Sequence, residues 1–283
     1  MTNTFPPQHQ PQHPGNQERM NPKPVTYDDS YIGTNKLKDM VAIVTGGDSG
    51  IGQAIAIIYA KEGANIVVPY FTESGDANET ARIVQQTGRR CVLVKCDLRQ
   101  EQSAREVVDT TLREFGKIDI LVNNIAVQYP QNSIEDITAE QLDNTFKTNI
   151  YSYFFMTKAV LPHLKAGSAI INTTSVTAYK GSTDLIDYSA TKGAIVSFTR
   201  SLSLSLAQRE IRVNAVAPGP VWTPLIPSSF SPEKVEQFGS DVPMQRAAQP
   251  VEIAPAYVYL ASKDSSFVTG QVMHLNGGVI TES

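Results

Sequence analysis

The strongest signal in the chain is the stretch Thr45-Gly46-Gly47-Asp48-Ser49-Gly50-Ile51-Gly52. It follows a short β-branched run at residues 41–45 and leads into a helical pattern that starts at Gln53. Glycines in such a turn let the backbone bend sharply and approach a pyrophosphate, whose charge is stabilised by free N–H groups at the helix N-terminus. Glycine also occurs in ordinary turns, but the order of strand, turn and helix predicts a dinucleotide-binding turn.

Further along the chain, short β-branched runs alternate with longer helical patterns. The predicted strands are residues 41–45, 66–68, 91–95, 118–122, 169–173, 212–216 and 272–275. Strands separated by helix-length segments are typical of βαβ units, whose right-handed crossovers place helices on both faces of a parallel sheet. We therefore expect an α/β fold: a single doubly wound, Rossmann-type domain with a seven-stranded parallel sheet.

The first part of the chain has a different composition. Six of the 17 prolines and several glutamines lie before residue 25, with few large apolar side chains. Such a segment buries too little surface to offset its ordering entropy. We expect a Pro/Gln-rich N-terminal arm over residues 1–36, flexible or extended, with docking onto another subunit as the alternative. Residues 37–283 are then the dinucleotide-binding catalytic domain.

Composition and charge exclude several classes of function. Of the 283 residues, 41% are hydrophobic and 18% are charged, which is ordinary for a globular protein. A net charge of -4 without a dense basic run argues against a nucleic-acid partner. No stretch approaches the roughly 18 apolar residues that a membrane span needs, and the N-terminal segment holds no apolar core suited to secretion. We expect a cytoplasmic protein with no membrane partner.

The cysteines and histidines give no sign of a disulfide or a metal site. Cys91 and Cys96 are five positions apart in a strand-like stretch, so their side chains point to opposite faces. The four histidines (His9, His13, His163 and His274) are scattered and show no ligand spacing. We expect neither an internal disulfide nor a bound metal.

Tyr188 and Lys192 are four residues apart in a helical pattern, so they share one face of the helix. An ammonium close to a phenol favours the phenolate and lowers a pKa that is normally near 10. A tyrosine tuned in this way can give a proton to a carbonyl or take one from an alcohol. Taken alone, such a pair is more often an ordinary surface pair.

Two further polar residues change that interpretation. Ser175 ends the fifth predicted strand, at the carboxyl edge where open α/β sheets bind ligands. Its hydroxyl could hold a substrate oxygen beside the phenol, and Asn149 could join a water chain that reaches Lys192. Taken singly, Ser175 could be a turn residue and Asn149 a helix cap or kink.

Together these residues resemble the short-chain dehydrogenase/reductase family. Residues 45–52 match its Thr-Gly-x-x-x-Gly-x-Gly turn, and Asn149, Ser175, Tyr188 and Lys192 match its Asn-Ser-Tyr-Lys tetrad in order and approximate spacing. The resemblance runs from about residue 37 to 278. It implies that Tyr188 is the acid/base, Ser175 holds the substrate oxygen, Lys192 tunes Tyr188 and binds ribose, and Asn149 serves a proton relay.

The same resemblance implies the cofactor contacts. Asp97 would bond the adenine amine, Asn123 would steady the sheet edge, and Val221 and Thr223 would contact the carboxamide. The full implied set is Gly46, Asp48, Ser49, Gly50, Ile51, Gly52, Tyr70, Asp97, Leu98, Asn123, Ile125, Ala126, Tyr188, Lys192, Pro218, Gly219, Val221 and Thr223. Asp97 could instead be a helix N-cap. Ile125-Ala126 departs from the family's common Ala-Gly and would narrow the space near the cofactor.

Met20-Asn21-Pro22-Lys23-Pro24 and residues 172–181 and 216–227 carry a closer resemblance. They look like bacterial general-stress short-chain oxidoreductases and plant glucose and ribitol dehydrogenase homologues. The implied activity is an NAD(P)-dependent oxidoreductase that transfers a hydride between nicotinamide and a secondary alcohol, aldehyde or ketone. The alternative is a non-catalytic nucleotide-binding sensor or scaffold, which usually lacks part of the tetrad. An enoyl-thioester reductase is disfavoured, since that branch spaces its Tyr and Lys seven residues apart.

Residues 219–247 are rich in proline and follow the sixth strand, where a lid over the substrate would lie. The alternative is a rigid surface excursion. Apolar and aromatic candidates near the reacting carbon are Tyr129, Tyr179, Trp222 and Leu225.

The charged residues near the glycine turn and the second strand bear on the choice between NAD and NADP. Neither the glycine turn nor the exit of the second strand offers a base for the extra phosphate of NADP, and Asp48, Glu73 and Asp76 would repel it. We therefore favour NAD, with NADP possible.

The expected helix at residues 189–207 carries small residues on one face, which predicts pairing into a homotetramer, although these residues could instead pack on the sheet.

Overall fold

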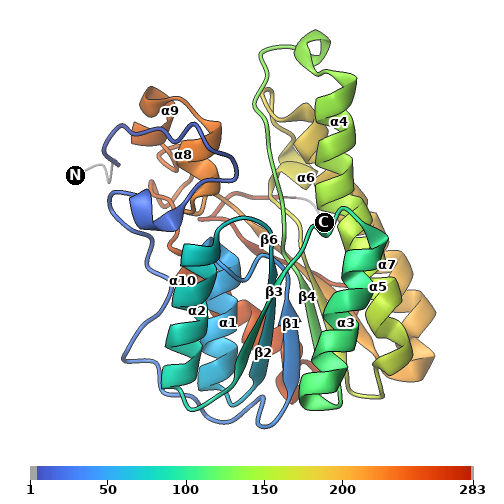
Figure 1. Cartoon of the computed structure of the whole chain (residues 1–283). Helices are drawn as coiled ribbons and strands as arrows, with labels where there is room; N and C mark the ends of the chain where they lie inside the picture. Colours follow the sequence, from blue (N-terminus) through green and yellow to red (C-terminus); the bar gives the residue numbers. More distant parts are fainter. Residues whose placement is uncertain (1–4, 282–283) are drawn as a thin grey trace.

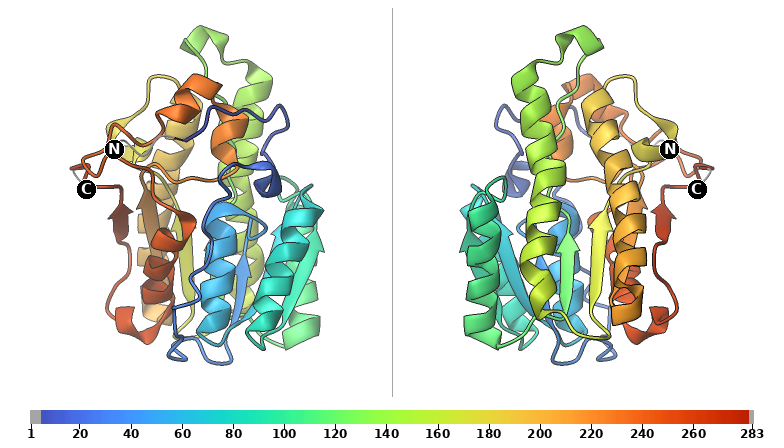
Figure 2. Two further views of the ribbon diagram at one scale, coloured as in Figure 1. Left: turned by 90° about the vertical axis from the view of Figure 1, so that its left-hand side faces the viewer. Right: turned by 90° about the vertical axis from the view of Figure 1, so that its right-hand side faces the viewer.

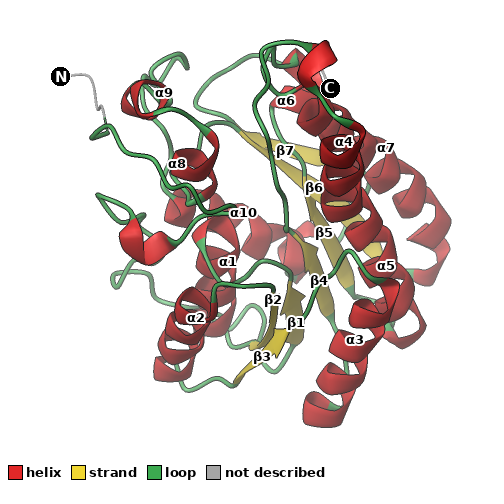
Figure 3. Cartoon of the chain, turned by 45° about the horizontal axis from the view of Figure 1, so that its top comes forward, coloured by secondary structure: helices red, strands yellow, loops and turns green. Residues whose placement is uncertain are grey.

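Seven parallel strands form one sheet in the order β3-β2-β1-β4-β5-β6-β7 in the computed structural model, which describes residues 5–281 (Figure 3). The strands are β1 (Val41–Val44), β2 (Asn65–Tyr70), β3 (Cys91–Lys95), β4 (Ile120–Asn123), β5 (Ala169–Thr173), β6 (Arg212–Pro218) and β7 (Val272–Leu275). The predicted α/β fold with a seven-stranded parallel sheet is confirmed. Three predicted strands match at both ends, whereas β2 and β6 extend further because they continue to pair with their neighbours beyond the apolar run.

Helices cover both faces of this sheet (Figure 2). On one face lie α1 (Gly50–Lys61), α2 (Ser74–Gln86) and α10 (Pro250–Ala261), and on the other lie α3 (Glu101–Phe115), α5 (Ser152–Val160) and α7 (Ile186–Leu206). The remaining helices are α4 (Ala139–Phe146), α6 (Thr177–Lys180), α8 (Leu225–Ser229) and α9 (Pro232–Glu236). The central strands β1, β4 and β5 are buried along their whole length. Their side chains fill two cores, one under each helical layer, as expected for a doubly covered parallel sheet.

The two cysteines lie on opposite sides of the sheet. Cys91 packs against the core that contains α1 and α10, and Cys96 packs against the core that contains α3 and α5. Both are free thiols, and the predicted placement of their side chains on opposite faces is confirmed. Within residues 5–281, no group of three or more His, Cys, Asp or Glu side chains could hold a metal ion. None of the helices described there is long and apolar enough to cross a membrane.

The N-terminal arm follows an extended path interrupted by one 3-10 turn, Gln17–Arg19. Its described part begins at residue 5; residues 1–4 lie outside the described residues. Figure 1 shows the arm in dark blue, crossing from α8 and α9 to the N-terminal ends of α1 and α2. Met20 is buried, and the arm packs on its own chain, which a freely flexible tail would not do.

Candidate active site

One cavity of about 690 Å³ opens at the carboxyl edge of the sheet. The glycine turn, the exits of β2 and β3, the loops after β4, β5 and β6, and the segment carrying α8 and α9 all contribute to its walls. Of the residues implied by sequence, the lining includes Gly46, Asp48, Ser49, Gly50, Ile51, Tyr70, Leu98, Ile125, Ala126, Ser175, Tyr188, Lys192, Pro218, Gly219, Val221 and Thr223. Gly52, Asp97, Asn123 and Asn149 do not line it.

The glycine turn has the geometry of an anion cradle. Gly46 has a φ of +63°, and a Cβ on Gly52 would lie 1.9 Å from the Gly46 carbonyl oxygen. Gly52 therefore lets α1 pack tightly on the turn, which explains why it lies behind the cavity surface. Ser49, the N-cap of α1, makes no side-chain capping bond. The Gly50 N–H is bonded to the Gln17 side chain, so the N–H groups of Ile51 and Gly52 are the ones in this turn that fit a dinucleotide pyrophosphate.

Tyr188 and Lys192 lie side by side on α7. The Lys192 Nζ donates to the Thr173 carbonyl oxygen at 3.0 Å and lies 5.3 Å from the centre of the Tyr188 ring. Lys192 is only 1% exposed, and burial lowers its pKa to about 7. Burial also raises the pKa of Tyr188 to about 12, against a smaller lowering by the hydrogen bond from Ser175. Removal from water disfavours the charged forms of both groups. That Lys192 lowers the pKa of Tyr188 stays a prediction.

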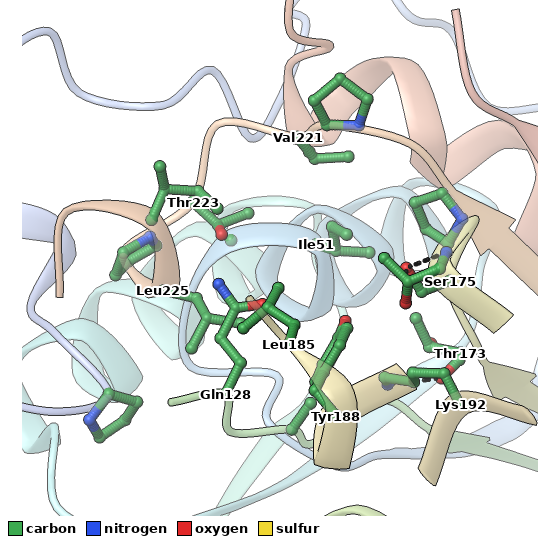
Figure 4. A pocket seen from close by; sticks show the side chains of 18 of the residues that line it. Ile51, Gln128, Thr173, Ser175, Leu185, Tyr188, Lys192, Val221, Thr223 and Leu225 are labelled. Atoms are coloured by element: carbon green, nitrogen blue, oxygen red, sulfur yellow. Dashed lines mark hydrogen bonds between the residues drawn. The ribbon is translucent and has the colours of Figure 1, made fainter. Parts of the chain in front are cut away.

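Ser175 faces the same part of the cavity as Tyr188 (Figure 4). Its Oγ accepts hydrogen bonds from the Thr177 N–H and the Thr177 hydroxyl, both at 3.1 Å. With its acceptor positions occupied, the Ser175 hydroxyl proton is left to donate into the cavity. A donor beside the Tyr188 phenol suits a carbonyl or alcohol oxygen held between the two hydroxyls.

Asn149 lies in a π-helical turn, Lys147–Tyr151, between α4 and α5. Its Oδ1 accepts from the Val127 N–H at 2.8 Å, and its Nδ2 donates to the Val127 carbonyl at 2.9 Å and to the Thr191 hydroxyl at 3.1 Å. The carboxamide thus links the loop after β4 to α7. A π-turn is frequent at functional sites, and here it aims Asn149 at the loop that carries Ile125 and Ala126.

Asp97 is paired with a cation and does not line the cavity. Its carboxylate is gripped by the Arg99 side chain, with an Nη2–Oδ2 distance of 2.8 Å. Burial opposes ionisation of Asp97, but the hydrogen bonds and charge of Arg99 outweigh it and lower the pKa. The neighbouring Leu98 lines the cavity instead. The alternative of a helix N-cap is also wrong, since Gln100 is the N-cap of α3.

Arg99 is a cation that the sequence reasoning missed. Its Nη1 donates to Asn144 at 2.7 Å, and its guanidinium lies 5.3 Å from the centre of the Phe71 ring, just beyond β2. Its position in the sequence, two residues after Asp97, could have indicated an ion pair between these two side chains.

Asn123 is fully buried at the end of β4. Its Nδ2 donates to the Asn172 Oδ1 at 3.0 Å on the neighbouring strand and to the Thr157 hydroxyl at 3.3 Å on α5. These bonds join β4, β5 and α5 beneath the cavity. Asn123 therefore braces the floor of the site.

Gln128 was also missed. It is 5% exposed, lines the cavity, and its Nε2 is buried without a hydrogen-bond partner. Figure 4 shows its carboxamide reaching into the pocket between Leu225 and Leu185, on the side of Tyr188. A buried amide without a partner costs free energy unless a ligand supplies one. No sequence motif marks this residue, because its importance arises from where its loop lies.

Three of the four residues that we expected near the reacting carbon do not line the cavity. Trp222 is fully buried, with Phe5 stacked on it at 3.8 Å. Tyr129 packs against His13, and Tyr179 packs against His274. Only Leu225 of this group lines the cavity, because the other rings are engaged in packing with the arm or the C-terminal segment.

Acidic side chains gather where β2 ends. Asp48 and Glu73 line the cavity, and Asp76 lies nearby on the first turn of α2. Burial raises the pKa of Asp48 to about 6, and the negative charges of Asp76 and Glu73 add to this effect.

Several known proteins are similar to this chain in sequence or in structure. A family model described as "Enoyl-(Acyl carrier protein) reductase" matches residues 46–280. General stress protein 39 of Bacillus subtilis is 54% identical over 97% of this chain and 96% of its own length. Glucose and ribitol dehydrogenase of Daucus carota is 52% identical over 98% of this chain and 97% of its own length. The crystal structure of a short chain dehydrogenase from Burkholderia cenocepacia in complex with NADP superimposes with a TM-score of 0.81 at 27% identity, over 86% of this chain and 98% of that chain.

Proposed function

The chain belongs to the short-chain dehydrogenase/reductase family, and from this premise we propose that it transfers a hydride between a nicotinamide dinucleotide and a secondary alcohol, aldehyde or ketone. One observation carries the proposal: Ser175, Tyr188 and Lys192 converge in the cavity that also contains the glycine turn. The turn fits a pyrophosphate, and the hydroxyl pair lies where a substrate oxygen would be polarised.

The chain's own residues then have distinct tasks. The dinucleotide, when bound, supplies or accepts the hydride at the substrate carbon. In the reducing direction Tyr188 gives its phenolic proton to the carbonyl oxygen, while Ser175 donates a hydrogen bond to the same oxygen. In the oxidising direction Tyr188 takes the alcohol proton. Lys192 binds the ribose and, when protonated, stabilises the phenolate, while Asn149 holds the surrounding loop in place for proton relay.

Two other functions fit less well. A nucleotide-binding sensor or scaffold has no need for a buried Tyr, Lys and Ser in one pocket, each of which costs stability. The name of the matching family model is that of an enoyl-thioester reductase. The offset of four residues between Tyr188 and Lys192 favours carbonyl or alcohol chemistry over that reaction.

For the cofactor we favour NAD, with NADP possible. The glycine turn carries Asp48 rather than a base, and Glu73 and Asp76 follow β2. These carboxylates suit ribose hydroxyls and repel a phosphate. The Burkholderia neighbour was crystallised with NADP. Arg99 is a cation four residues beyond β3, but its guanidinium is already paired with Asp97.

We assign the lid role to residues 219–247, which contribute Val221, Thr223 and Leu225 to the cavity. Lys234 on α9 forms an ion pair with Asp184 on the loop before α7. Lys180 of α6 lies 3.8 Å from Asp241. All four residues line the cavity, and closure of this segment would exclude water during hydride transfer.

The test is Tyr188→Phe. The ring still packs and the dinucleotide still binds, but the ionisable hydroxyl is lost, so kcat should fall by about 100- to 10,000-fold. Activity is followed by nicotinamide absorbance on a panel of aldehydes, ketones and polyols. Near-normal turnover by this variant on a good substrate would disprove the acid/base assignment.

A further inference from the structure

The N-terminal arm touches the back of the glycine turn through Gln17. The Gln17 Oε1 accepts from the Gly50 N–H at 2.8 Å, and its Nε2 donates to the Gln53 Oε1 at 2.6 Å. The Gln17 backbone N–H donates to the Asp76 Oδ2 at 2.8 Å. One arm residue is therefore bonded to the first residue of α1, to a buried residue one turn further on, and to α2.

Gln17 reaches this turn from outside the cavity, because it is not among the lining residues whereas Gly50 and Ile51 are. The first N–H groups of a helix have no partners within the helix. By accepting from Gly50, Gln17 uses one of these N–H groups and fixes the direction of the first turn of α1, while the N–H groups of Ile51 and Gly52 remain for an anion. Gln53 continues the contact by donating to the Thr80 hydroxyl of α2 at 2.8 Å.

The arm also holds the acidic end of the cavity. Gln12 Nε2 donates to one carboxylate oxygen of Glu73 at 2.8 Å, and Asn16 Nδ2 donates to the other at 3.0 Å. These donors are neutral amides, so they fix the position of the Glu73 carboxylate without cancelling its charge. Since Glu73 lines the cavity, the arm sets the place of an acceptor that can bond ribose hydroxyls.

On both sides of Gln17 the arm is also bound to the segment that carries α8. Pro14 lines the cavity, and its carbonyl accepts from the Ser228 hydroxyl at 2.9 Å. The Trp222 indole N–H donates to the Pro22 carbonyl at 2.9 Å, and Phe5 stacks on the Trp222 ring. The arm thus connects the glycine turn to the proposed lid, two segments that are far apart in the sequence (Figure 1).

The arm lies outside the part of the chain that the family model matches, which starts at residue 46. The Burkholderia structure covers 86% of this chain although 98% of its own length is matched. The Bacillus and carrot relatives, in contrast, align over 97% and 98% of this chain. The arm is therefore an addition to the fold that the family shares. The alignments with the Bacillus and carrot relatives include most of this arm.

We propose that the arm is a fixed part of the dinucleotide site, in which Gln17 is a positioning residue that holds the glycine turn in its binding conformation. The inference rests on the proposed function only in requiring that the ligand be a nicotinamide dinucleotide. It assigns the arm to binding of that ligand and gives it no part in the proton transfer at Tyr188.

The test replaces Gln17 with methionine, which keeps the length and packing of the side chain but removes both hydrogen bonds. Binding of NAD and NADP to the full-length protein is measured by calorimetry, without substrate. We expect the dinucleotide Kd to rise about tenfold, equivalent to about 1.4 kcal/mol, and the dinucleotide KM to rise with it. The value of kcat and the KM for the second substrate should remain unchanged, because the reacting groups are untouched.

Gln8→Met is the matched control, because among residues 5–281 the Gln8 carboxamide bonds only Pro6 and Asn21, both in the arm. Trp222 is the single tryptophan of the chain, and its emission reports whether the arm remains docked, since Phe5 and Pro22 contact its ring. Both variants should keep the parent emission maximum, and the control should keep the parent Kd.

Two results would overturn the proposal: a Gln17→Met variant whose Kd stays within twofold of the parent, or one whose Kd rises only together with a shifted Trp222 emission and a reduced kcat. The second result would mean that the arm has detached and that Gln17 anchors the arm without positioning the turn. Failure of the parent protein to bind either dinucleotide is a different result, which would reject the proposed function itself.

Discussion

Buried Lys192 should reduce the free energy of unfolding of the protein, although the proposed reaction needs this residue. It is 1% exposed, and burial lowers its pKa from 10.5 to about 7. A lysine whose pKa is depressed on folding destabilises the native state fully below the folded pKa, and this penalty disappears as pH rises towards the unfolded pKa. At 1.36 kcal/mol per tenfold change in protonation, the penalty is about 4 kcal/mol at pH 7 and about 1 kcal/mol at pH 9.5.

The perturbation that isolates this penalty is Lys192→Met, which keeps most of the side-chain volume and removes the charge. The Thr173 carbonyl loses the Lys192 donor but keeps the Tyr153 hydroxyl at 3.2 Å, so it is not left unpaired. We expect the variant to be inactive but more stable than the parent by up to about 4 kcal/mol at pH 7, with the gain falling to about 1 kcal/mol at pH 9.5.

The assay is urea unfolding followed by far-ultraviolet circular dichroism at fixed protein concentration and without dinucleotide. Lys165→Met, at an exposed position, is the matched control and should change stability by less than about 0.5 kcal/mol at either pH. If Lys192→Met gave no gain at pH 7, or the same gain at both pH values, the argument from burial would be refuted.

Three further outcomes can be checked independently. Glu73→Gln removes a negative charge from the cavity wall and should raise the ratio of kcat/KM for NADP to kcat/KM for NAD by about tenfold. If this ratio, measured with one substrate, stayed unchanged, the Glu73 charge would not be a cause of NAD preference. Gln128→Leu removes a buried amide without a partner, so it should stabilise the empty protein by about 1 kcal/mol, yet raise the substrate KM while leaving the dinucleotide Kd unchanged. Light scattering should give four times the monomer mass of 30.9 kDa, since exposed positions of α7 such as Ala190, Ser197 and Ser201 face away from the sheet, whereas a monomer at micromolar concentration would contradict the tetramer.

Local pattern was enough to predict the fold, and the family resemblance placed 16 of its implied residues in the cavity lining. The strands alternate with helices because β-branched runs and helical periodicity are properties of neighbouring residues, and right-handed crossovers leave few ways to join them. The glycine turn, and the pair Tyr188 and Lys192, were visible for the same reason. Their geometry depends on spacings of a few residues within one strand-turn-helix unit or one helix.

The remaining features depend on contacts between distant parts of the chain. The arm packs because Phe5 and Pro22 meet Trp222, about 200 residues away, and because Gln17 meets the start of α1. Composition alone favoured a loose tail, since it counts the arm's own apolar surface and not the surface that the domain offers. Gln128 and the pairing of Asp97 with Arg99 likewise could not be read from a motif. The pKa of Tyr188 rises because burial, which is a property of the whole fold, outweighs the hydrogen bond from Ser175.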